Sequence, residues 1–423
     1  MINVTQSRDR GDNQVSENLS MLERVLEFES EISRVRDVDL LLEKILGEAR
    51  CFTNADAGSI YIREGDSLKF SYTQNDTLQS QLPSGKKLIY STFSTPINSN
   101  SISGHVAVTG QPLNIPDAWE ISRETPYSFN RSYDELSGYR TRSMLTLPLT
   151  TQRGDVSGVL QLINAKNKKG DVIPFPESGM PVLVHLANAA ANAVERAKLT
   201  RGIILRMNKM AELRDPKETG AHVNRVASYS VALYEAWANM KGLPPVEIDR
   251  NRDLLRLAAM LHDVGKVAIS DVILKKPGRF TPEEYEIMKQ HTLFGARLFG
   301  EVYSDIDAAA MDVTLNHHEW WDGNGYPGYL DTLTGITLPG FEGANGRARG
   351  KKGEEIPLFG RIVAIADVYD ALSNKRCYKE AWDADAVIEE LKNESGRMFD
   401  PELLEVFLLN METIQHISSL YPD

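Results

Sequence analysis

Residues 254–266 read Leu254-Leu-Arg-Leu-Ala-Ala-Met-Leu-His262-Asp263-Val-Gly-Lys266. The apolar run predicts a buried helix that ends at the adjacent His262 and Asp263. An ionised aspartate in such surroundings is costly unless a cation or several hydrogen bonds compensate for its burial. A metal ion would do so, and a single salt bridge is the structural alternative. The Gly265-Lys266 pair then turns the chain and adds a cation to the same region.

Most of the other histidines lie near this stretch in the sequence. Five of the eight histidines fall between residues 222 and 318, and the scattered ones are His105, His185 and His416. His222 follows Glu218 by four residues on a helical segment, so both side chains project from one face. Taken alone, His222 is no more than a helix histidine. The clustering of the five is the first indication of a metal site.

Two further elements contribute histidines. Thr281-Pro-Glu-Glu284 has the sequence of a capping box, and His291 is expected on the helix that this box starts. His317 and His318 are adjacent, end an apolar helix and lead into a turn rich in Gly, Asn and Pro. Packing alone does not explain two neighbouring histidines at such a place.

The last element supplies carboxylates. It reads Arg361-Ile-Val-Ala-Ile-Ala-Asp367-Val-Tyr-Asp370. Asp367 interrupts an apolar helical run, and Asp370 lies one turn further on. Together with the five imidazoles these groups offer nitrogen and oxygen ligands and no thiolate. That donor set favours iron or manganese, with nickel or zinc as alternatives, and is too large for a single ion. We expect two or three divalent ions.

The ordered motifs resemble the HD phosphohydrolase superfamily, and Gly325-Tyr326-Pro327 resembles its HD-GYP branch, the bacterial cyclic di-GMP phosphodiesterases. The resemblance covers about residues 205–423 and implies an all-α domain. It implies the metal ligands Glu218, His222, His262, Asp263, His291, His317, His318 and Asp367. Asp263 would bridge two ions, and Glu218 would accompany a third. It further implies substrate contacts by Lys266, Asp370, Arg376 and Lys379, with Asp263, Lys266 and Asp370 as catalytic residues.

The sequence departs from that branch after Pro327. Residues 329–350 form an insertion before the Glu-Ile-Pro-Leu segment, and the basic residues near its end are Arg347, Arg349, Lys351 and Lys352. We interpret the insertion as a solvated surface loop, because loops tolerate added residues. The alternative is a lid or a basic wall over the substrate cleft.

The N-terminal half has a different texture. Residues 1–20 are expected to be a polar tail, and residues 21–195 run from helical segments into strand-like runs and back to helix. The runs are Ser59-Ile-Tyr-Ile, Leu68-Lys-Phe-Ser-Tyr, Met144-Leu-Thr-Leu-Pro-Leu and Gly158-Val-Leu-Gln-Leu-Ile. This order predicts an α+β domain with an antiparallel sheet. Together with the segment 103–117, the last two runs resemble a GAF domain, which implies a small-molecule ligand of unknown identity.

A helical linker, residues 196–212, is predicted to join this domain to the catalytic domain at 213–423. An alternating 3,4 spacing connects Leu183, Leu186, Ala190, Ala193, Ala197, Thr200, Ile204, Met207 and Ala211. The spacing is that of a weak coiled-coil seam. The alternative is one face of a helix packed on its own domain. We expect a parallel homodimer in which the sensor passes a twist or shift to the catalytic unit.

Composition limits the classes of function. The net charge of -12 argues against binding to a nucleic-acid backbone, but metal ions and local basic residues can still attract a small anion. No apolar run approaches the roughly 20 residues of a membrane helix, and the polar N-terminus has no signal-peptide core. The two cysteines, Cys51 and Cys377, fit a reducing cytoplasm.

The sequence thus predicts a cytoplasmic, metal-dependent phosphodiesterase that hydrolyses cyclic di-GMP to pGpG, with a second cut to GMP as an extension, under the control of the GAF domain. One alternative is a catalytically weak receptor for a cyclic dinucleotide. Another is a phosphodiesterase for a different cyclic dinucleotide, such as cyclic GMP-AMP. The resemblance also implies a diguanylate cyclase as a partner through the loop at 325–327.

Overall fold

The computed structural model describes residues 23–82, 94–214, 220–343, 347–374 and 382–422. The chain divides into two units, residues up to Thr200 and residues from Arg201 onward. The predicted polar tail and three predicted site residues, Glu218, Arg376 and Lys379, lie outside the described residues. Within the described ranges, no helix has both the length and the apolar character needed to cross a membrane.

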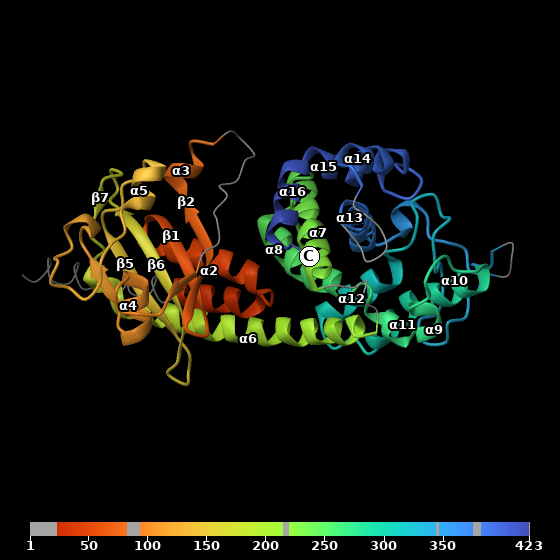
Figure 1. Cartoon of the computed structure of the whole chain (residues 1–423), viewed down its shortest axis with the longest axis horizontal. Helices are drawn as coiled ribbons and strands as arrows, with labels where there is room; N and C mark the ends of the chain where they lie inside the picture. Colours follow the sequence, from red (N-terminus) through yellow and green to blue (C-terminus); the bar gives the residue numbers. More distant parts are fainter. Residues whose placement is uncertain (1–22, 83–93, 215–219, 344–346, 375–381, 423) are drawn as a thin grey trace, which may run out of the picture. The chain divides into compact units, whose positions relative to one another are not determined.

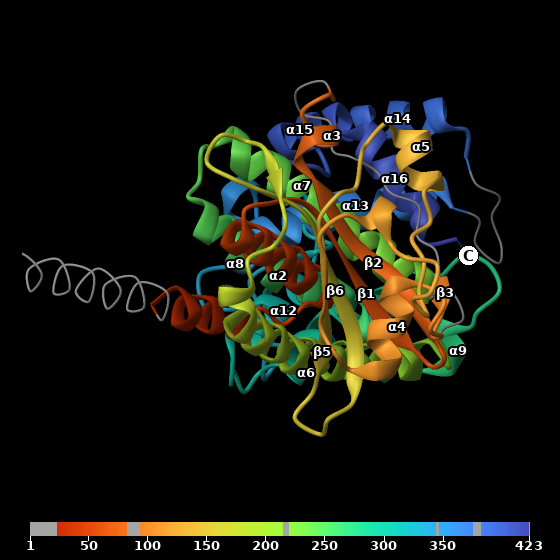
Figure 2. The ribbon, with the colours of Figure 1, turned by 90° about the vertical axis from the view of Figure 1, so that its left-hand side faces the viewer.

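The first unit is built on an antiparallel sheet (Figures 1 and 2). Its strands are β1 (Ala55–Glu64), β2 (Ser67–Asn75), β3 (Ser94–Pro96), β4 (Leu113–Ile115), β5 (Met144–Thr150), β6 (Val156–Lys166) and β7 (Val172–Ile173). They follow the order β3-β2-β1-β6-β5-β4, and β7 also pairs with β6. At the centre Ile60 of β1 lies opposite Leu160 of β6. All four strand-like runs lie in strands of this sheet, so the predicted α+β architecture is confirmed.

Helices cover both faces of this sheet, since alternate residues of each strand point to opposite sides. On one face, α2 (Val38–Thr53) and α6 (Met180–Glu212) share a core with β1, β5 and β6 that includes Ile60, Leu147 and Leu160. On the other face, Val106 of α4 (Ile102–Thr109) packs with Val159. Figure 2 shows the strands between α2 and α4. The shorter helices of this unit are α3 (Asp76–Gln79) and α5 (Ser132–Ser137).

The helix α6 carries the residues that were assigned to a coiled-coil seam. Those buried in the core of the first unit are Leu183, Leu186, Ala190, Ala193 and Ala197. Ile204 lies in the core of the second unit, with Met207 packed against it. Apolar surface that is already buried within one chain cannot form a seam with another copy. For the buried residues the structure favours the alternative, packing on the chain's own domains. Thr200 and Met207 are only partly buried, and the coiled-coil linker stays a prediction. The homodimer stays a prediction.

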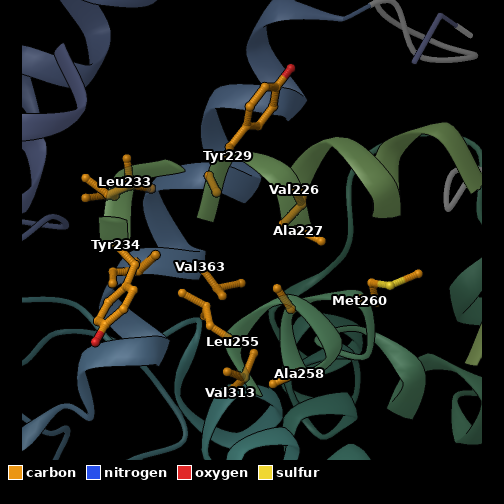
Figure 3. Close-up of a cluster of buried hydrophobic side chains, with 14 of the residues drawn as sticks. Val226, Ala227, Tyr229, Leu233, Tyr234, Leu255, Ala258, Met260, Val313 and Val363 are labelled. Carbon is orange, nitrogen blue, oxygen red and sulfur yellow. The ribbon is translucent and has the colours of Figure 1, made fainter. Parts of the chain in front are cut away.

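The second unit is helical, as predicted. After the end of α6 its helices are α7 (Gly220–Met240), α8 (Pro245–Met260), α9 (Asp271–Leu274), α10 (Pro282–Lys289), α11 (His291–Leu298), α12 (Asp305–Asn316), α13 (Leu358–Ser373), α14 (Ala384–Asn393), α15 (Pro401–Leu409) and α16 (Met411–Leu420). Its core lies between α7, α8, α12 and α13, where Val226, Leu255, Val313 and Val363 are fully buried (Figure 3). Polar side chains gather where these helices begin or end.

Candidate metal centre

Three of the core helices each deliver part of one polar cluster. His222 lies in the first turn of α7, His262 and Asp263 lie two and three residues after Met260, the last residue of α8, and Asp367 lies on α13. The same helices bury the apolar core, so their packing fixes the distances between these side chains. His262 is fully buried and Asp263 nearly so.

The remaining histidines arrive on α11 and α12. The helix that the capping box at Thr281 starts, α10, ends at Lys289, and His291 is the first residue of α11. The expectation that His291 lies on the capped helix is therefore corrected. α11 lies very close to the segment after Asp263. A Cβ atom at Gly265 would collide with the carbonyl oxygen of His291, so there is no room for a side chain at this position. Glycine at this position thus allows His291 to lie beside Asp263.

These side chains form two groups of possible metal ligands. One group offers ligand atoms within 4.8 Å of one another from Asp263, His291, His317 and His318. The other does so from His222, His262 and Asp367. Asp263 connects the two, because its Oδ1 lies 3.1 Å from Nε2 of His291 and its Oδ2 lies 3.3 Å from Nε2 of His262. Seven of the eight predicted ligands converge in this way, and the eighth, Glu218, is outside the described residues.

Four of the histidines are oriented through Nδ1. Main-chain carbonyl oxygens lie 2.8, 2.7 and 3.0 Å from Nδ1 of His262, His291 and His317. For His222 the acceptor is Oδ2 of Asp370, at 2.8 Å. Carbonyl and carboxylate oxygens only accept, so in the neutral form of each ring Nδ1 carries the proton and Nε2 has a lone pair. This is the arrangement in which histidines bind metals.

Several buried polar atoms at the centre lack a hydrogen-bond partner among the described residues. They are Nε2 of His262, Nε2 of His291, Nε2 of His317 and Oδ1 of Asp263. Each such atom costs about 1–3 kcal/mol when buried without a partner, and native proteins contain few of them. Divalent ions would supply the missing partners, and a set of imidazoles and carboxylates without thiolate fits such ions.

The electrostatics favour the metal-binding protonation states of Asp263, His317 and His318. Burial alone would raise the pKa of Asp263, but Lys266, with Nζ 2.6 Å from Oδ2, and His262 hold this pKa well below its usual range. Burial lowers the pKa of His317 and, more strongly, that of His318. Burial also acts to lower the pKa of His262, but the neighbouring carboxylates raise it. An ionised Asp263 and neutral His317 and His318 are the forms that ligate metals.

The turn at 325–327 lies against this centre. The ring of Tyr326 stacks on that of His318, with centroids 4.9 Å apart and planes inclined by 26°. Glu319 is buried and accepts hydrogen bonds from the backbone N–H groups of Gly328, at 2.5 Å, and Lys351, at 3.1 Å. Burial raises the pKa of Glu319 to about 7. The sequence did not single out Glu319, although its place directly after two histidines was a signal.

The insertion after this turn packs against itself and against α10 and α11. Tyr329 and Phe341 stack with centroids 4.0 Å apart, and Nε of Arg297 donates to the carbonyl oxygen of Thr332 at 2.9 Å. Three of the four basic residues have partners within the chain: Arg347 pairs with Glu286, Arg349 with Glu355, and Lys351 with Asn316. These contacts favour the surface-loop interpretation over a basic wall that faces a substrate.

Asp370 lies behind His222 and is 1% exposed. Nε and Nη2 of Arg225 donate to its Oδ1 and Oδ2, at 2.6 and 3.0 Å, and its Oδ2 is also the acceptor for His222. Both carboxylate oxygens are therefore engaged inside the protein. This position differs from the one expected for a contact to substrate phosphates, and Arg225 is a residue that the sequence did not indicate.

Comparisons with known proteins agree with this geometry. The family model of the GAF domain matches residues 37–194, and that of the HD domain matches residues 219–372. The chain contains a GAF domain followed by an HD domain. The resemblance inferred from the motifs is thus confirmed, and the His/Asp cluster lies within the residues matched by the HD domain.

The curated relatives include several bacterial phosphodiesterases. The 3'3'-cGAMP-specific phosphodiesterase 2 of Vibrio cholerae is 36% identical over 230 residues, which cover 54% of this chain and 38% of the relative. A cyclic di-GMP phosphodiesterase of the same species is 38% identical over 274 residues, covering 62% and 51%. One from Thermotoga maritima is 38% identical over 202 residues, covering 48% and 47%. The chain thus spans about half or less of the length of these relatives.

Proposed function

We propose that the HD unit is a metal-dependent phosphodiesterase that hydrolyses a cyclic dinucleotide, with cyclic di-GMP as the first candidate and linear pGpG as the product. The observation that carries this proposal is the set of inward-facing buried atoms on His262, His291, His317 and Asp263, which have no hydrogen-bond partner among the described residues. A cluster with a purely structural role would satisfy these atoms within the chain.

A phosphodiester is anionic, so an attacking hydroxide is repelled unless positive charge is present. Divalent ions held by the two ligand groups would supply that charge and lower the pKa of a water molecule. Asp263 would hold the two groups in register, since its two oxygens face different histidines. Nζ of Lys266 lies 2.6 Å from Oδ2 of Asp263, and it would stabilise charge on the non-bridging phosphate oxygens.

The substrate is proposed on the strength of the relatives. Those from Vibrio cholerae and Thermotoga maritima that are 38% identical are cyclic di-GMP phosphodiesterases. The relative that is 36% identical is specific for 3'3'-cGAMP, and this makes cyclic GMP-AMP the second candidate. A receptor without activity is disfavoured, because a receptor has no need of a complete ligand set.

Further elements of the proposal rest on the sequence. We propose iron or manganese as the metal, Glu218 as a ligand of a third ion that promotes the cut from pGpG to GMP, and Arg376 and Lys379 as phosphate contacts. The GAF domain would bind a small molecule and regulate the HD unit in a homodimer. The turn at 325–327 would offer a contact to a diguanylate cyclase.

One experiment tests the core of this proposal. The full chain, loaded with Mn²⁺ or with Fe²⁺ under anaerobic conditions, is incubated with cyclic di-GMP, 3'3'-cGAMP and cyclic di-AMP, and the products are separated by chromatography. We expect linear pGpG from cyclic di-GMP, and no product from a His262→Ala variant prepared in the same way. Turnover of 3'3'-cGAMP alone would select the second candidate. Absence of any product with every metal would refute the phosphodiesterase assignment.

A further inference from the structure

His222 is anchored differently from the other oriented histidines of the centre. His262, His291 and His317 each bond through Nδ1 to a main-chain carbonyl oxygen three or four residues earlier. Local helical geometry thus fixes these rings. His222 instead bonds to Asp370, which is 148 residues further along the chain on α13. Its orientation depends on a side chain from another helix.

Asp370 is itself held from two sides. Arg225, one turn after His222 on α7, grips both oxygens of Asp370 with Nε and Nη2. Nδ2 of Asn374 donates to Oδ1 at 2.9 Å, and Nη1 of Arg225 donates to the carbonyl oxygen of Tyr421 at 2.8 Å. A forked guanidinium that meets a carboxylate through two bonds fixes its plane as well as its position. Oδ2 of Asp370 is thereby directed at Nδ1 of His222.

The cost of this arrangement indicates that it has a task beyond stability. Arg225 is 2% exposed and Asp370 is 1% exposed, so both charges are removed from water. Buried ion pairs often add no net stability, because the desolvation of two charges offsets their attraction. Asp370 also follows the predicted ligand Asp367 by three residues on α13. The pair therefore contacts one predicted ligand, His222, directly and lies one helical turn from another, Asp367.

We propose that Arg225 and Asp370 are positioning residues that hold His222 in the orientation needed to bind a metal ion. The inference rests on the proposed metal centre and assigns Asp370 to the support of a ligand instead of to substrate phosphate. It concerns one of the two ligand groups, that of His222, His262 and Asp367. The group around His291, His317 and His318 is oriented without this pair.

Titration of the metal-free full chain with Mn²⁺ by calorimetry, together with elemental analysis, tests the proposal without any substrate. Asp370→Asn removes the carboxylate charge and one of its two acceptor oxygens. We expect one ion to bind about 10- to 100-fold more weakly, the loss typical of removing a group that orients a metal ligand. The affinity for the other ion should stay close to that of the parent. Arg225→Lys keeps the charge without the fork, so we expect an intermediate loss.

Asp400→Asn is the matched control. Arg361 Nη1 lies 2.6 Å from Oδ2 of Asp400, so this is a second arginine–aspartate pair in the same unit, with Asp400 buried and Arg361 partly buried. It contacts none of the predicted ligands, and we expect unchanged Mn²⁺ affinity for both ions. If Asp370→Asn fails to fold, the double variant Arg225→Met with Asp370→Leu replaces the pair by apolar side chains, which such sites often tolerate. The same weakened site is expected in it.

Parent-like affinity for both ions in Asp370→Asn and in the double variant would overturn the proposal. A raised KM at unchanged metal affinity would instead return Asp370 to the role of a substrate contact. Failure of the phosphodiesterase assignment is a separate result, because the metal titration does not depend on turnover. A parent that binds no divalent ion would overturn both the metal centre and this inference.

Discussion

Asp56 in the GAF unit and Asp263 in the HD unit are alike in surroundings and differ in how their oxygens are used. Asp56 is 4% exposed and Asp263 is 8% exposed, and each has a lysine beside it, Lys166 or Lys266. Asp56 accepts from Lys166 through Oδ1 and from Thr77 and Tyr139 through Oδ2. Oδ1 of Asp263 has no such partner within the described part of the chain and faces two histidine Nε2 atoms.

The difference separates a structural network from a binding site. A buried carboxylate whose oxygens are both satisfied contributes to the fold and has nothing left to bind a ligand. A buried carboxylate with an unsatisfied oxygen is costly in the protein alone, and that cost disappears only when something else is bound. Burial and a neighbouring cation therefore do not identify a functional aspartate. A functional aspartate is identified by a buried oxygen that accepts no hydrogen bond within the protein.

The largest expected effect comes from Asp263→Asn. The amide keeps the size of the side chain but removes the charge that connects the two ligand groups. We expect hydrolysis of the cyclic dinucleotide to fall by at least about 100- to 1,000-fold, the scale of losing a preorganised electrostatic group. The metal-free HD unit should lose some stability, because Nζ of Lys266, 2.6 Å from Oδ2, loses its charged partner. Rates at saturating metal, with circular dichroism as the folding control, check this. Parent-like turnover in the folded, metal-loaded variant would contradict it.

Metal addition should stabilise only one of the two units. An ion that binds the folded HD unit at 100 times its Kd raises the unfolding free energy by about 2.7 kcal/mol. The described part of the GAF unit holds no group of three or more possible metal ligands, and both oxygens of Asp56 are engaged, so the GAF unit should not respond. Thermal unfolding with and without Mn²⁺ should show one transition that moves upward and returns on addition of a chelator. A shift of both transitions by the same amount would mean that the units unfold as one or that both bind metal.

Asp56→Asn is the counterpart in the GAF unit. Its loss leaves the donors of Tyr139, Thr77 and Lys166 without their charged acceptor, and we expect a loss of about 1–3 kcal/mol. Hydrolysis of the cyclic dinucleotide, measured without a GAF ligand, should have the same rate in Asp56→Asn as in the parent. Urea unfolding and the turnover assay together measure the two results. A loss of activity as large as that of Asp263→Asn would remove the distinction between the two aspartates.

The pH dependence of this variant sharpens the comparison. Burial acts to raise the pKa of Asp56, but the bonds from Lys166, Thr77 and Tyr139 outweigh it and lower the pKa below its ordinary value of 3.8. A lowered folded-state pKa gives stability that is present above the unfolded pKa and lost as pH falls through the folded pKa. The stability difference between the parent and Asp56→Asn should therefore be full at pH 7 and shrink below about pH 4. A difference that is constant down to pH 2 would contradict the ionised network.

Much of the fold and of the candidate metal centre could be predicted from the sequence, because the signals for them were local. Strand-like runs bounded by turns located β1, β2, β5 and β6, and buried polar residues in apolar helices located the converging ligands. The capping box at Thr281 is present as predicted. Each of these features depends on residues within a few positions of one another, so one stretch of sequence is enough to indicate it.

The features that escaped prediction depend on contacts between distant segments. The 3,4 spacing in α6 fits a partner helix and an intramolecular core equally well, and only the fold shows that Leu186 and Ala190 pack inside. The role of Asp370 depends on Arg225, which is 145 residues earlier. Nothing in the sequence near Glu319 reveals that the backbone at Gly328 and Lys351 folds onto it.

The helix α6 runs from the GAF unit, which contains the hydrogen-bonded network of Asp56, into the HD unit, which contains the ligands around Asp263. The buried residues of α6 up to Ala197 belong to the core of the GAF unit. Ile204 belongs to the core of the HD unit. In the HD unit, Nδ2 of Asn208 donates to the carbonyl oxygen of Met260 at 2.9 Å, two residues before His262. Nη2 of Arg214 donates to the carbonyl oxygen of Ile269 at 2.8 Å. The end of α6 and the turn after it, which carries Arg214, therefore bond to both sides of the segment that carries His262, Asp263 and Lys266.

The smallest expected effect comes from changing the phase of this helix. One residue inserted between Thr200 and Arg201, where α6 passes from one core to the other, rotates the downstream part by about 100° relative to the upstream part. Because Asn208 and Arg214 are bonded to the ligand segment, we expect turnover to change about 5-fold, at the lower end of the 5- to 150-fold range typical of coupling between sites. Seven inserted residues span nearly two full turns and should restore most of the parent rate. Asn208→Ala, combined with the single insertion, should reduce its effect, because one of the two connections is lost. Equal turnover in the parent and in every insertion variant would mean that α6 is a passive tether and that the GAF unit does not act on the metal centre through it.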